Sequence, residues 1–565
     1  MAESTDRPSA EPLFGILSSD AASGTTDVVV IGGGVAGLVA ARQLAHLGNT
    51  VTVVESREAV GGFVATREIA GVRLDSGAES FATRKGTVAS LVTELGLGDD
   101  IVVPAEAGAW VAWDGGIAPL PASGVLGIPG VPLADDVRRI IGWGGSLRAY
   151  LDRLMPLLRV RAETDLGDIV RRRMGRRVLD RLVTPVVAGV HSADPSVVDV
   201  HTVAPGLTQA MTTQGSLSGA VMALREQAPA GSQVQGIAGG VYRLIEALEA
   251  DCRYYGVQFR TATRVSGLSR AGGGEWTVGL APADGASLAD LADADADASD
   301  DAGANANANA DAYAGGDAHA DDLGAASPLV ARAVVVATGF RTGLALLAEA
   351  GVGRGGEDAP PSLSPSPARA GMPAPEPSTP LPPQSDWPEP ASVTIATLVV
   401  DDARLDAHPR GTGVLVAPGT PRVTAKALTH SSAKWRWLAD SLPAHRHVLR
   451  LSYGRRGADA RPSSEPAVDL ATVLADASAL LGVPLSEADV AGFDTMVWAE
   501  SLAFATVGHK ARVRQTLAAV QRVAGLDVVG AWVSGTGLAA TVEHAQTTAS
   551  GLAAELRGDR RLDAD

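Results

Sequence analysis

The sequence has 565 residues, enough for two or three domains that share a large core. A formal net charge of −17 and an isoelectric point near 5.1 disfavour nonspecific binding to nucleic acid, and the single cysteine, Cys252, excludes an internal disulfide or a thiolate metal cluster. Residues 1–26 lack the pattern of a signal peptide, and no run of 18 apolar residues predicts a membrane span. We expect a cytoplasmic protein that binds a small molecule, with residues 1–26 as a disordered extension.

The first predicted fold element is a strand that leads into a glycine-rich turn. Residues 27–31 read Asp-Val-Val-Val-Ile, and Gly32, Gly34 and Gly37 follow with the spacing Gly-x-Gly-x-x-Gly. Gly32 permits the tight turn, Gly34 lets the backbone approach a pyrophosphate, and Gly37 lets the next helix pack closely on the sheet. The N-terminus of that helix offers free N–H groups to phosphates. This order predicts a dinucleotide site.

The next apolar run, 51–54, ends at an acid. Glu55 is placed to accept hydrogen bonds from a ribose 2′-OH, and a carboxylate there disfavours the 2′-phosphate of NADP, so we expect FAD or NAD. Gly61 and Gly62 follow directly and resemble the pattern of glutathione-reductase-like flavoproteins, which favours FAD. The alternative is a turn in an ordinary surface loop.

Residues 134–190 are predicted to be mainly helical. Apolar residues recur every three or four positions, as in a buried stripe, at Leu133, Val137, Ile140, Ile141, Leu147, Leu151, Leu154, Leu158, Leu166, Ile169, Val170, Val178 and Leu182. Two arginine clusters, 171–173 and 176–177, have two interpretations. They form either a solvated helix face or a docking patch for a membrane or an anionic partner.

Two segments depart from a globular composition. Residues 281–327 consist largely of Ala, Asp, Asn and Gly, which predicts a mobile insertion, and residues 353–390 form a Pro-rich flexible segment. The flanks of the insertion, 275–280 and 329–339, read as paired strands, so the insertion is expected to extend the tip of a hairpin.

Residues 528–537 have the same kind of pattern as the opening turn. An apolar strand leads to Gly530, Gly535 and Gly537, and a helix is expected from Thr541. Such a turn brings backbone N–H groups to a flavin or a phosphate. The alternative is a simple glycine loop.

Several separated stretches together carry a family resemblance. They are 32–37, 77–85, 127–129, 166–175, 185–195, Trp498, 507–510 and 530–537. Taken together they resemble the bacterial oxygen-dependent coproporphyrinogen III and protoporphyrinogen oxidases, of the monoamine-oxidase-like flavoprotein superfamily. The Gly-x-x-x-x-Asp-Pro stretch from Gly189 to Pro195 and the stretch Gly508-His509-Lys510 are the most discriminating, because a generic amine oxidase does not need them.

The resemblance implies an α/β fold of the two-dinucleotide-domain flavoprotein type. A Rossmann-like FAD-binding domain would comprise residues 27–105, 225–345 and 500–558. An inserted α+β substrate-binding domain and a helical region would comprise residues 106–224 and 392–499.

The same resemblance implies non-covalent FAD and a set of residues that contact it. These are Gly32, Gly33, Gly34, Val35, Ala36, Gly37, Glu55, Ser56, Gly61, Gly62, Gly77, Ala78, Glu79, Ser80, Val265, Gly535, Thr536, Gly537 and Leu538. Arg84 and Lys85 would face the substrate cavity and bind propionates, the alternative being two surface charges. No catalytic acid or base and no metal ligand is expected.

The implied activity is the six-electron oxidation of coproporphyrinogen III to coproporphyrin III in heme biosynthesis, with oxygen consumed and hydrogen peroxide released. Protoporphyrinogen IX is the alternative substrate. An amine oxidase, a carotenoid desaturase or an inactive flavoprotein scaffold are alternatives of other classes. Handover of product to a ferrochelatase, and the oligomeric state, stay open.

Overall fold

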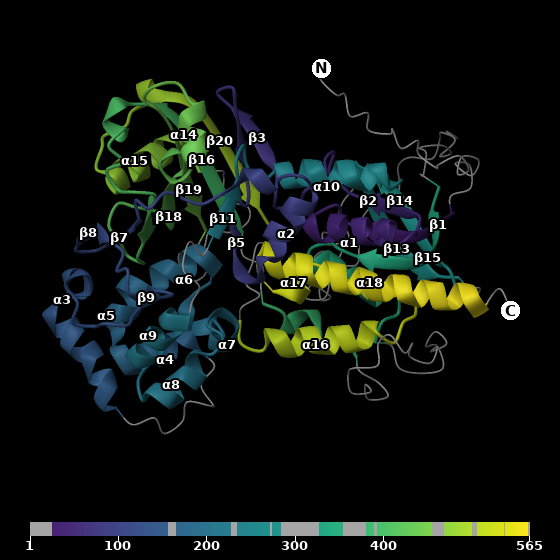
Figure 1. The fold of residues 1–565 in the computed structure, drawn as a ribbon, viewed down its shortest axis with the longest axis horizontal. Coiled ribbons are helices and arrows are strands. Elements are labelled where there is room, and N and C mark those ends of the chain that lie inside the picture. The colour runs from purple at the N-terminus through teal and green to yellow at the C-terminus, as the bar shows by residue number, and fades with distance from the viewer. Residues whose placement is uncertain are drawn as a thin grey trace, which may run out of the picture.

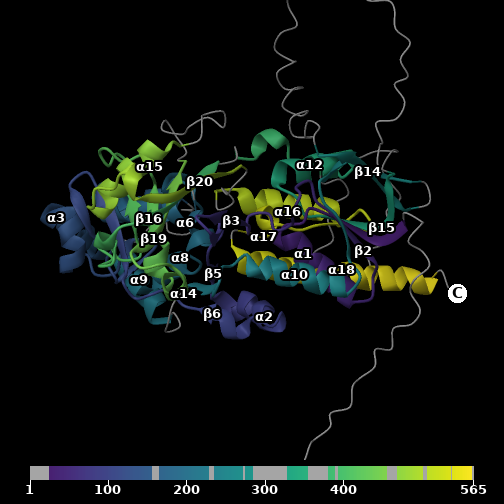
Figure 2. The same ribbon diagram turned by 90° about the horizontal axis from the view of Figure 1, so that it is seen from above.

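The computed structural model describes residues 25–155, 165–191, 193–227, 234–271, 274–283, 327–353, 380–388, 392–454, 468–499, 506–535 and 537–562. Nearly all of the expected N-terminal extension and Ala/Asp insertion, and most of the Pro-rich segment, lie outside these residues. The described chain forms two lobes that lie side by side in both views (Figures 1 and 2).

The first lobe is built on a sheet whose central strands are parallel. Its order is β12 (Gln258–Arg260), β2 (Val51–Val54), β1 (Thr25–Ile31), β15 (Leu329–Val336), β14 (Trp276–Pro282) and β13 (Thr263–Arg270), and β21 (Leu526–Val528) pairs with β15. Strands β12, β2, β1, β15 and β21 pair in parallel, whereas β14 pairs with both β15 and β13 in antiparallel fashion. The predicted hairpin around the insertion, β14 and β15, is therefore confirmed.

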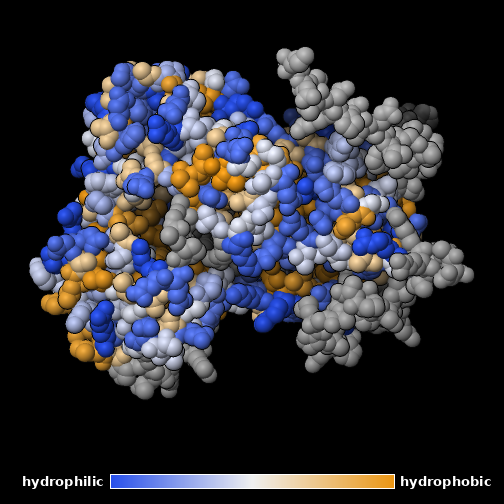
Figure 3. Space-filling view, viewed as in Figure 1, coloured by the Kyte–Doolittle hydropathy of each residue, from blue (hydrophilic) through white to orange (hydrophobic). Residues whose placement is uncertain are grey.

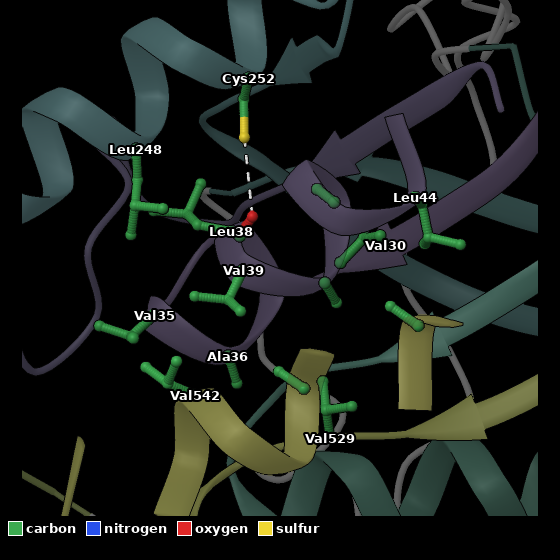
Figure 4. Close-up of a cluster of buried hydrophobic side chains, with 14 of the residues drawn as sticks. Val30, Val35, Ala36, Leu38, Val39, Leu44, Leu248, Cys252, Val529 and Val542 are labelled. Carbon is green, nitrogen blue, oxygen red and sulfur yellow. Dashed lines mark hydrogen bonds between the residues drawn. The ribbon is translucent and has the colours of Figure 1, made fainter. Parts of the chain in front are cut away.

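Both faces of this sheet are covered, because successive side chains of β1 alternate between two cores. Val28 and Val30 pack under α1 (Val35–His46), α10 (Arg243–Tyr254) and α18 (Leu538–Leu562). Val29 and Ile31 face α12 (Phe340–Glu349) and α16 (His509–Val520). Cys252 lies fully buried in the first core, where its Sγ approaches the Leu38 carbonyl, as expected of a small apolar residue (Figure 4).

The second lobe contains a mixed sheet drawn from two distant parts of the chain. Its order is β20 (Val490–Trp498), β16 (Val393–Asp401), β19 (Arg446–Tyr453), β18 (Ala427–His430), β17 (Gly413–Val416), β7 (Ala109–Trp113) and β8 (Gly116–Pro119). Helix α15 (Leu470–Leu481) covers one face, where Leu449 and Leu451 of β19 join its core, while Val448 between them faces the other side. The expected Rossmann-like sheet with a second α+β domain is confirmed.

The helical region completes the second lobe, below this sheet in Figure 1. It contains α3 (Asp135–Tyr150), a 3-10 helix (Leu151–Leu154), α4 (Leu166–Met174), α5 (Arg176–Val178), a π-helical turn (Leu179–Val183), α6 (Thr184–His191), α7 (Val200–Val203), α8 (Leu207–Gln214) and α9 (Leu217–Gln227). The predicted helices and the burial of Leu166, Ile169, Val170, Val178 and Leu182 are confirmed.

The predicted buried stripe is wrong in the second half of α3 and in the 3-10 helix that follows it. Val137 and Ile141 are buried, but Leu147, Leu151 and Leu154 are 54%, 48% and 74% exposed. The physical reason is Gly142, whose φ of 71° interrupts the helix, so the residues on either side of it do not share one face. Leu158 lies outside the described residues.

Candidate functional site

The opening glycine turn is closed by backbone contacts that leave no room for side chains. Gly32 N donates to Val54 O over 2.8 Å. A Cβ atom on Gly32 would stand 2.8 Å from Ala337 O at the end of β15, and one on Gly37 would stand 1.9 Å from Gly32 O. Glycine is therefore required at both positions, for the turn and for the docking of α1 upon it.

Glu55 reaches back from the end of β2 to this turn. Its Oε2 accepts from Gly33 N at 2.7 Å, and its Oε1 accepts from Arg57 N at 2.9 Å and from Ser56 Oγ at 3.3 Å. The residue is 9% exposed. A carboxylate can accept about four hydrogen bonds, so Glu55 can still accept a hydrogen bond from a hydroxyl group of a ribose.

Gly61 and Gly62 lie directly against the opening turn. Gly61 N donates to Gly33 O over 2.8 Å, and Gly61 forms a parallel bridge with Gly34. A Cβ atom on Gly62 would stand 3.1 Å from the Gly34 Cα. The two glycine stretches thus form one continuous backbone surface.

Val265 is brought to the same edge by the strands after α10. Glu55 N donates to Arg260 O over 2.8 Å, and Thr263 N donates to Glu55 O over 3.0 Å, so β13 starts beside Glu55. Val265 is 6% exposed and shares a core with Val54.

The C-terminal glycine turn opens at the same end of the lobe. Gly535 and Gly537 have φ angles of 99° and 103°, and a Cβ atom on either would meet nothing within 4 Å. Helix α18 then begins at Leu538, and Figure 4 shows its Val542 beside Ala36 of α1. Thr536 lies outside the described residues.

Helices α1 and α18 run parallel, so their N-termini lie together. Ala36 lies beside Val542 (Figure 4), and further along both helices Gln43 Nε2 donates a hydrogen bond to Ser550 Oγ at 3.1 Å. Each N-terminus carries free N–H groups and a partial positive charge that favour an anion. Two such ends beside partly exposed glycine backbone are suited to a bound diphosphate.

The stretch Gly77–Ser80 is tied to the second lobe by a largely buried ion cluster. Glu79 Oε1 lies 2.6 Å from Lys434 Nζ, Glu79 Oε2 lies 2.7 Å from Arg450 Nη1, and Arg450 Nη2 donates to Gly77 O over 2.7 Å. Burial opposes ionisation of Glu79, but the charges of Lys434 and Arg450 outweigh it and lower its pKa to about 2. Sequence reasoning missed Lys434 and Arg450, since the only signal was an isolated lysine among apolar and aromatic neighbours.

A Cβ atom on Gly77 would stand 2.0 Å from Phe63 O, while Ala78 N donates to Phe63 O over 3.0 Å. Trp498 Nε1 donates to Ser76 O over 3.0 Å. The loop is therefore fixed from both lobes.

Lys85 already has a carboxylate partner. Its Nζ lies 2.9 Å from Glu543 Oε1 in the first turns of α18, and the lysine side chain is 65% exposed. Arg84 lies in the 3-10 helix Arg84–Gly86, and its side chain is outside the described part of the structure.

The stretch Gly508-His509-Lys510 and the two residues before it pack against the segment that follows Pro195, at the junction of the lobes. Thr506 forms a bridge with Val198, Val507 N donates to Val197 O over 3.0 Å, and Lys510 Nζ donates to His201 O over 3.4 Å. Asp194 caps the turn that leads there, accepting from Ser196 N at 2.8 Å. Both stretches therefore have a structural role.

His509 fixes the segment before the C-terminal glycine turn. Its Nε2 donates to Trp532 O over 2.8 Å, and burial lowers its pKa to about 4, although the bond to Trp532 opposes the shift. The ring is therefore neutral near pH 7, and its hydrogen bond positions α17 (Ala531–Ser534).

Comparison with known proteins agrees with this geometry. Residues 35–298 match the family model of the flavin containing amine oxidoreductases. The matched region covers slightly less than half of the chain, and over it the chain is similar to this family. Among curated relatives, the coproporphyrinogen III oxidase of Bacillus subtilis is 29% identical over 44% of this chain and 55% of its own length. That of Mycobacterium leprae is 25% identical over 93% of this chain and 98% of its own.

The chain thus spans about half the length of the Bacillus subtilis relative and of the other most similar curated relatives. A crystal structure from Exiguobacterium sp. 255-15, provisionally assigned as a protoporphyrinogen oxidase, superposes with a TM-score of 0.70 at 22% identity, over 94% of this chain and 99% of that one. This likeness concerns the fold. Over the matched residues the chain is similar to flavin-containing oxidoreductases and to relatives named as porphyrinogen oxidases. No helix among the described residues is both long and apolar enough to cross a bilayer.

Proposed function

We propose that the protein binds FAD and oxidises coproporphyrinogen III to coproporphyrin III, with three molecules of oxygen reduced to three of hydrogen peroxide. The reaction removes six hydrogen atoms, that is, six protons and six electrons, from the macrocycle. The macrocycle is therefore oxidised in three two-electron rounds. When bound, FAD supplies the two-electron chemistry of each round and the reaction with oxygen.

The observation that carries the proposal is the single backbone surface formed by Gly34, Gly61 and Gly62 in front of two parallel helix N-termini. These elements fit FAD. In the proposal the segment Gly32–Gly37 holds the diphosphate, Glu55 and Ser56 hold the ribose, and Val265 meets the adenine. The segments Gly61–Gly62, Gly77–Ser80 and Gly535–Leu538 flank the flavin.

The chain's own groups bind and orient the substrate. Arg84 and Lys85 are assigned to the propionates, because cations pair with carboxylates. The cluster of Glu79, Lys434 and Arg450 holds Gly77–Ser80 against the second sheet, so the two lobes keep a fixed spacing for the macrocycle. The domain boundaries and cytoplasmic location expected from the sequence stay predictions.

Protoporphyrinogen IX is the second candidate substrate, because the chloroplastic protoporphyrinogen oxidase 1 of Arabidopsis thaliana is 28% identical over 46% of this chain. Coproporphyrinogen III carries four propionates and protoporphyrinogen IX carries two. The larger number of carboxylates matches better the two neighbouring cations, Arg84 and Lys85, of the proposed site.

The test is the absorbance spectrum of the purified protein, followed by anaerobic titration. We expect flavin bands that bleach faster with coproporphyrinogen III than with protoporphyrinogen IX, and no bleaching with benzylamine. Absence of flavin bands contradicts the cofactor, and bleaching by benzylamine alone contradicts the substrate class.

A further inference from the structure

Four of the ten histidines gather at one corner of the second lobe, together with Asp406. His430 ends β18, His447 lies on β19, and His408 and His445 lie in the loops beside these strands. The rings of His408, His430 and His447 are close to edge-on, with centroids 5.1–6.4 Å apart. His430 is fully buried and His447 is 5% exposed. These five residues are called the histidine corner below.

A chain of hydrogen bonds runs through the histidine corner from its buried end to the surface. His430 Nε2 lies 3.1 Å from His447 Nδ1, and His447 Nε2 lies 3.0 Å from Asp406 Oδ1. His445 Nδ1 lies 2.7 Å from Asp406 Oδ2, and this bond is the main reason that the pKa of Asp406 lies below its ordinary value. The ionised carboxylate only accepts, so both of its histidines donate to it.

This chain has no place for an additional proton. Because His447 donates to Asp406 from Nε2, its Nδ1 accepts from His430, and a proton there would face the His430 N–H. A proton on His430 Nδ1 would be buried without an acceptor among the described residues. Burial lowers the pKa of both rings, to about 3 for His430. Below the ordinary histidine pKa of 6.5, an open corner binds a proton that the closed corner excludes, so closure is lost as the pH falls.

Neighbouring charges do not remove this conflict. Asp402 and Asp406 favour a proton on His447, but burial outweighs them and His408 opposes a proton on both buried rings. The other charged groups on the elements around the corner have partners of their own. These are Asp401 with Arg446, Arg404 with Asp402, Lys434 with Glu79, Arg436 with Asp440, Asp476 with the Ala425 N–H, and Arg410 over the Trp110 ring.

The histidine corner is connected to the candidate site by one turn of helix, α13 (Ser431–Lys434), which begins directly after His430. On one side of this turn, Ser432 Oγ stands 3.5 Å from His447 Nδ1. On the other side, Lys434 Nζ donates to Glu79 Oε1 over 2.6 Å. A shift of α13 therefore moves the cation that holds the loop of Glu79 in place.

Water reaches the histidine corner through a cavity of about 220 Å³, which Asp406, His408, His445 and His447 help to line. Helix α14 (Arg436–Ser441) also borders it, and Figure 3 shows mainly hydrophilic residues over the upper left of the second lobe, where α14 lies. His408 and His445 have φ angles of 46° and 64°, which are strained for residues other than glycine. The loops that carry them can therefore relax when the chain of hydrogen bonds breaks.

We propose that the histidine corner is an acid-sensitive latch on the candidate site. Protonation of His447 breaks its bond with His430, the two loops relax, and α13 shifts, so that Lys434 releases Glu79 and the stretch Gly77–Ser80 loosens. Weaker flavin binding in acid is the expected consequence, and that part rests on the proposed function. The loosening itself does not depend on it.

The experiment is hydrogen–deuterium exchange of the full-length protein at about pH 7.5 and about pH 5.5, corrected for the intrinsic exchange rate. One proton taken up on opening changes the opening equilibrium about tenfold per pH unit below the ordinary histidine pKa. We therefore expect peptides that cover residues 427–436 and 74–82 to lose about tenfold of their protection at the lower pH.

Two variants should abolish this acid response. His447→Gln keeps an N–H for Asp406 and does not titrate. His430→Phe fills the buried position and removes the opposing N–H, so that His447 can take a proton with Ser432 Oγ nearby as acceptor. His46→Gln is the matched control, because His46 also pairs with a carboxylate but lies on α1 in the other lobe, and it should keep the full response.

Asp75, whose pKa burial raises to about 6, titrates in the same range beside the loop, but it is present in every variant, so the difference between variants measures the latch. Circular dichroism at both pH values confirms that each variant is folded. The proposal is overturned by equal protection of the unaltered protein at the two pH values, or by an acid response that persists in His430→Phe. Absence of flavin bands in the same samples would contradict FAD binding instead, and the exchange result would still decide on the latch.

Discussion

Lys85 and Glu543 form an ion pair 458 positions apart in sequence, with Nζ 2.9 Å and 3.1 Å from the two carboxylate oxygens. If Lys85 binds a substrate propionate as proposed, that carboxylate has to displace Glu543 in the first turns of α18. Because both side chains are more than half exposed, the pair is weak enough to exchange.

Lys85→Glu should raise the KM for coproporphyrinogen more than it lowers flavin content, because it places a negative charge where a propionate is expected to bind. Glu543→Gln should act the other way and lower KM by about two- to fivefold, since it frees Lys85 from a surface ion pair. Steady-state kinetics and flavin absorbance measure both effects. Unchanged kinetics in both variants would contradict the assignment of Lys85 to the substrate site.

Gly37→Ala should abolish flavin binding and lower the melting temperature, because the new Cβ would stand 1.9 Å from Gly32 O and α1 could not dock on the turn. Gly551→Ala is the matched control. Gly551 lies within α18 with nothing within 4 Å of a new Cβ, so that change should leave the flavin spectrum intact and stabilise by about 0.5–1 kcal/mol. Full flavin content in Gly37→Ala would contradict the role given to the opening turn.

Glu79→Gln should lower the free energy of unfolding by about 3 kcal/mol near pH 7, because it leaves the largely buried Lys434 and Arg450 without their carboxylate. The ordinary pKa of 4.5 is lowered to about 2 in the folded protein, so the unfolded chain binds the extra proton between these values. Stability from this group is present above pH 4.5 and is lost as the pH falls toward 2.

Chemical unfolding across that pH range, with Glu79→Gln as reference, measures this difference. Glu249→Gln, which breaks an exposed pair with Arg253, should change stability by less than about 0.5 kcal/mol. Equal effects of the two substitutions would mean that the buried cluster does not tie the lobes together.

His509→Leu should destabilise by about 1–3 kcal/mol and weaken flavin binding, because the Trp532 carbonyl loses its donor. His509→Gln keeps an N–H donor and should restore most of the affinity. The histidine pKa falls from 6.5 to about 4 on folding, so stability from this group is lost as the pH drops from 6.5 to 4, and the Gln variant should lack that loss. Identical pH profiles for both proteins would contradict this account.

The parts of the site that depend on local spacing could be predicted from the sequence. Gly32, Gly37 and Glu55 lie within one strand, turn, helix and strand unit, so their contacts follow from neighbours in the chain. The Lys434 and Arg450 partners of Glu79 could not be predicted, because they lie on α13 (Ser431–Lys434) and on β19 of the other lobe, more than 350 residues away. Periodicity also failed at Leu147 and Leu154, since it identifies a helix face but not whether protein or solvent covers it.

The parallel packing of α1 on α18 bears on how the protein is made. Leu38 and Ala41 of α1 belong to the core that Ala545 and Ala549 of α18 complete, yet α18 is translated about 490 residues later. Until α18 has been synthesised, the apolar face of α1 stays exposed on the nascent chain. This exposed face can bind chaperones or cause aggregation. A ribosome that stalls before Leu538 therefore releases a polypeptide with its nucleotide turn present but with an uncovered core, a target for degradation rather than a smaller enzyme.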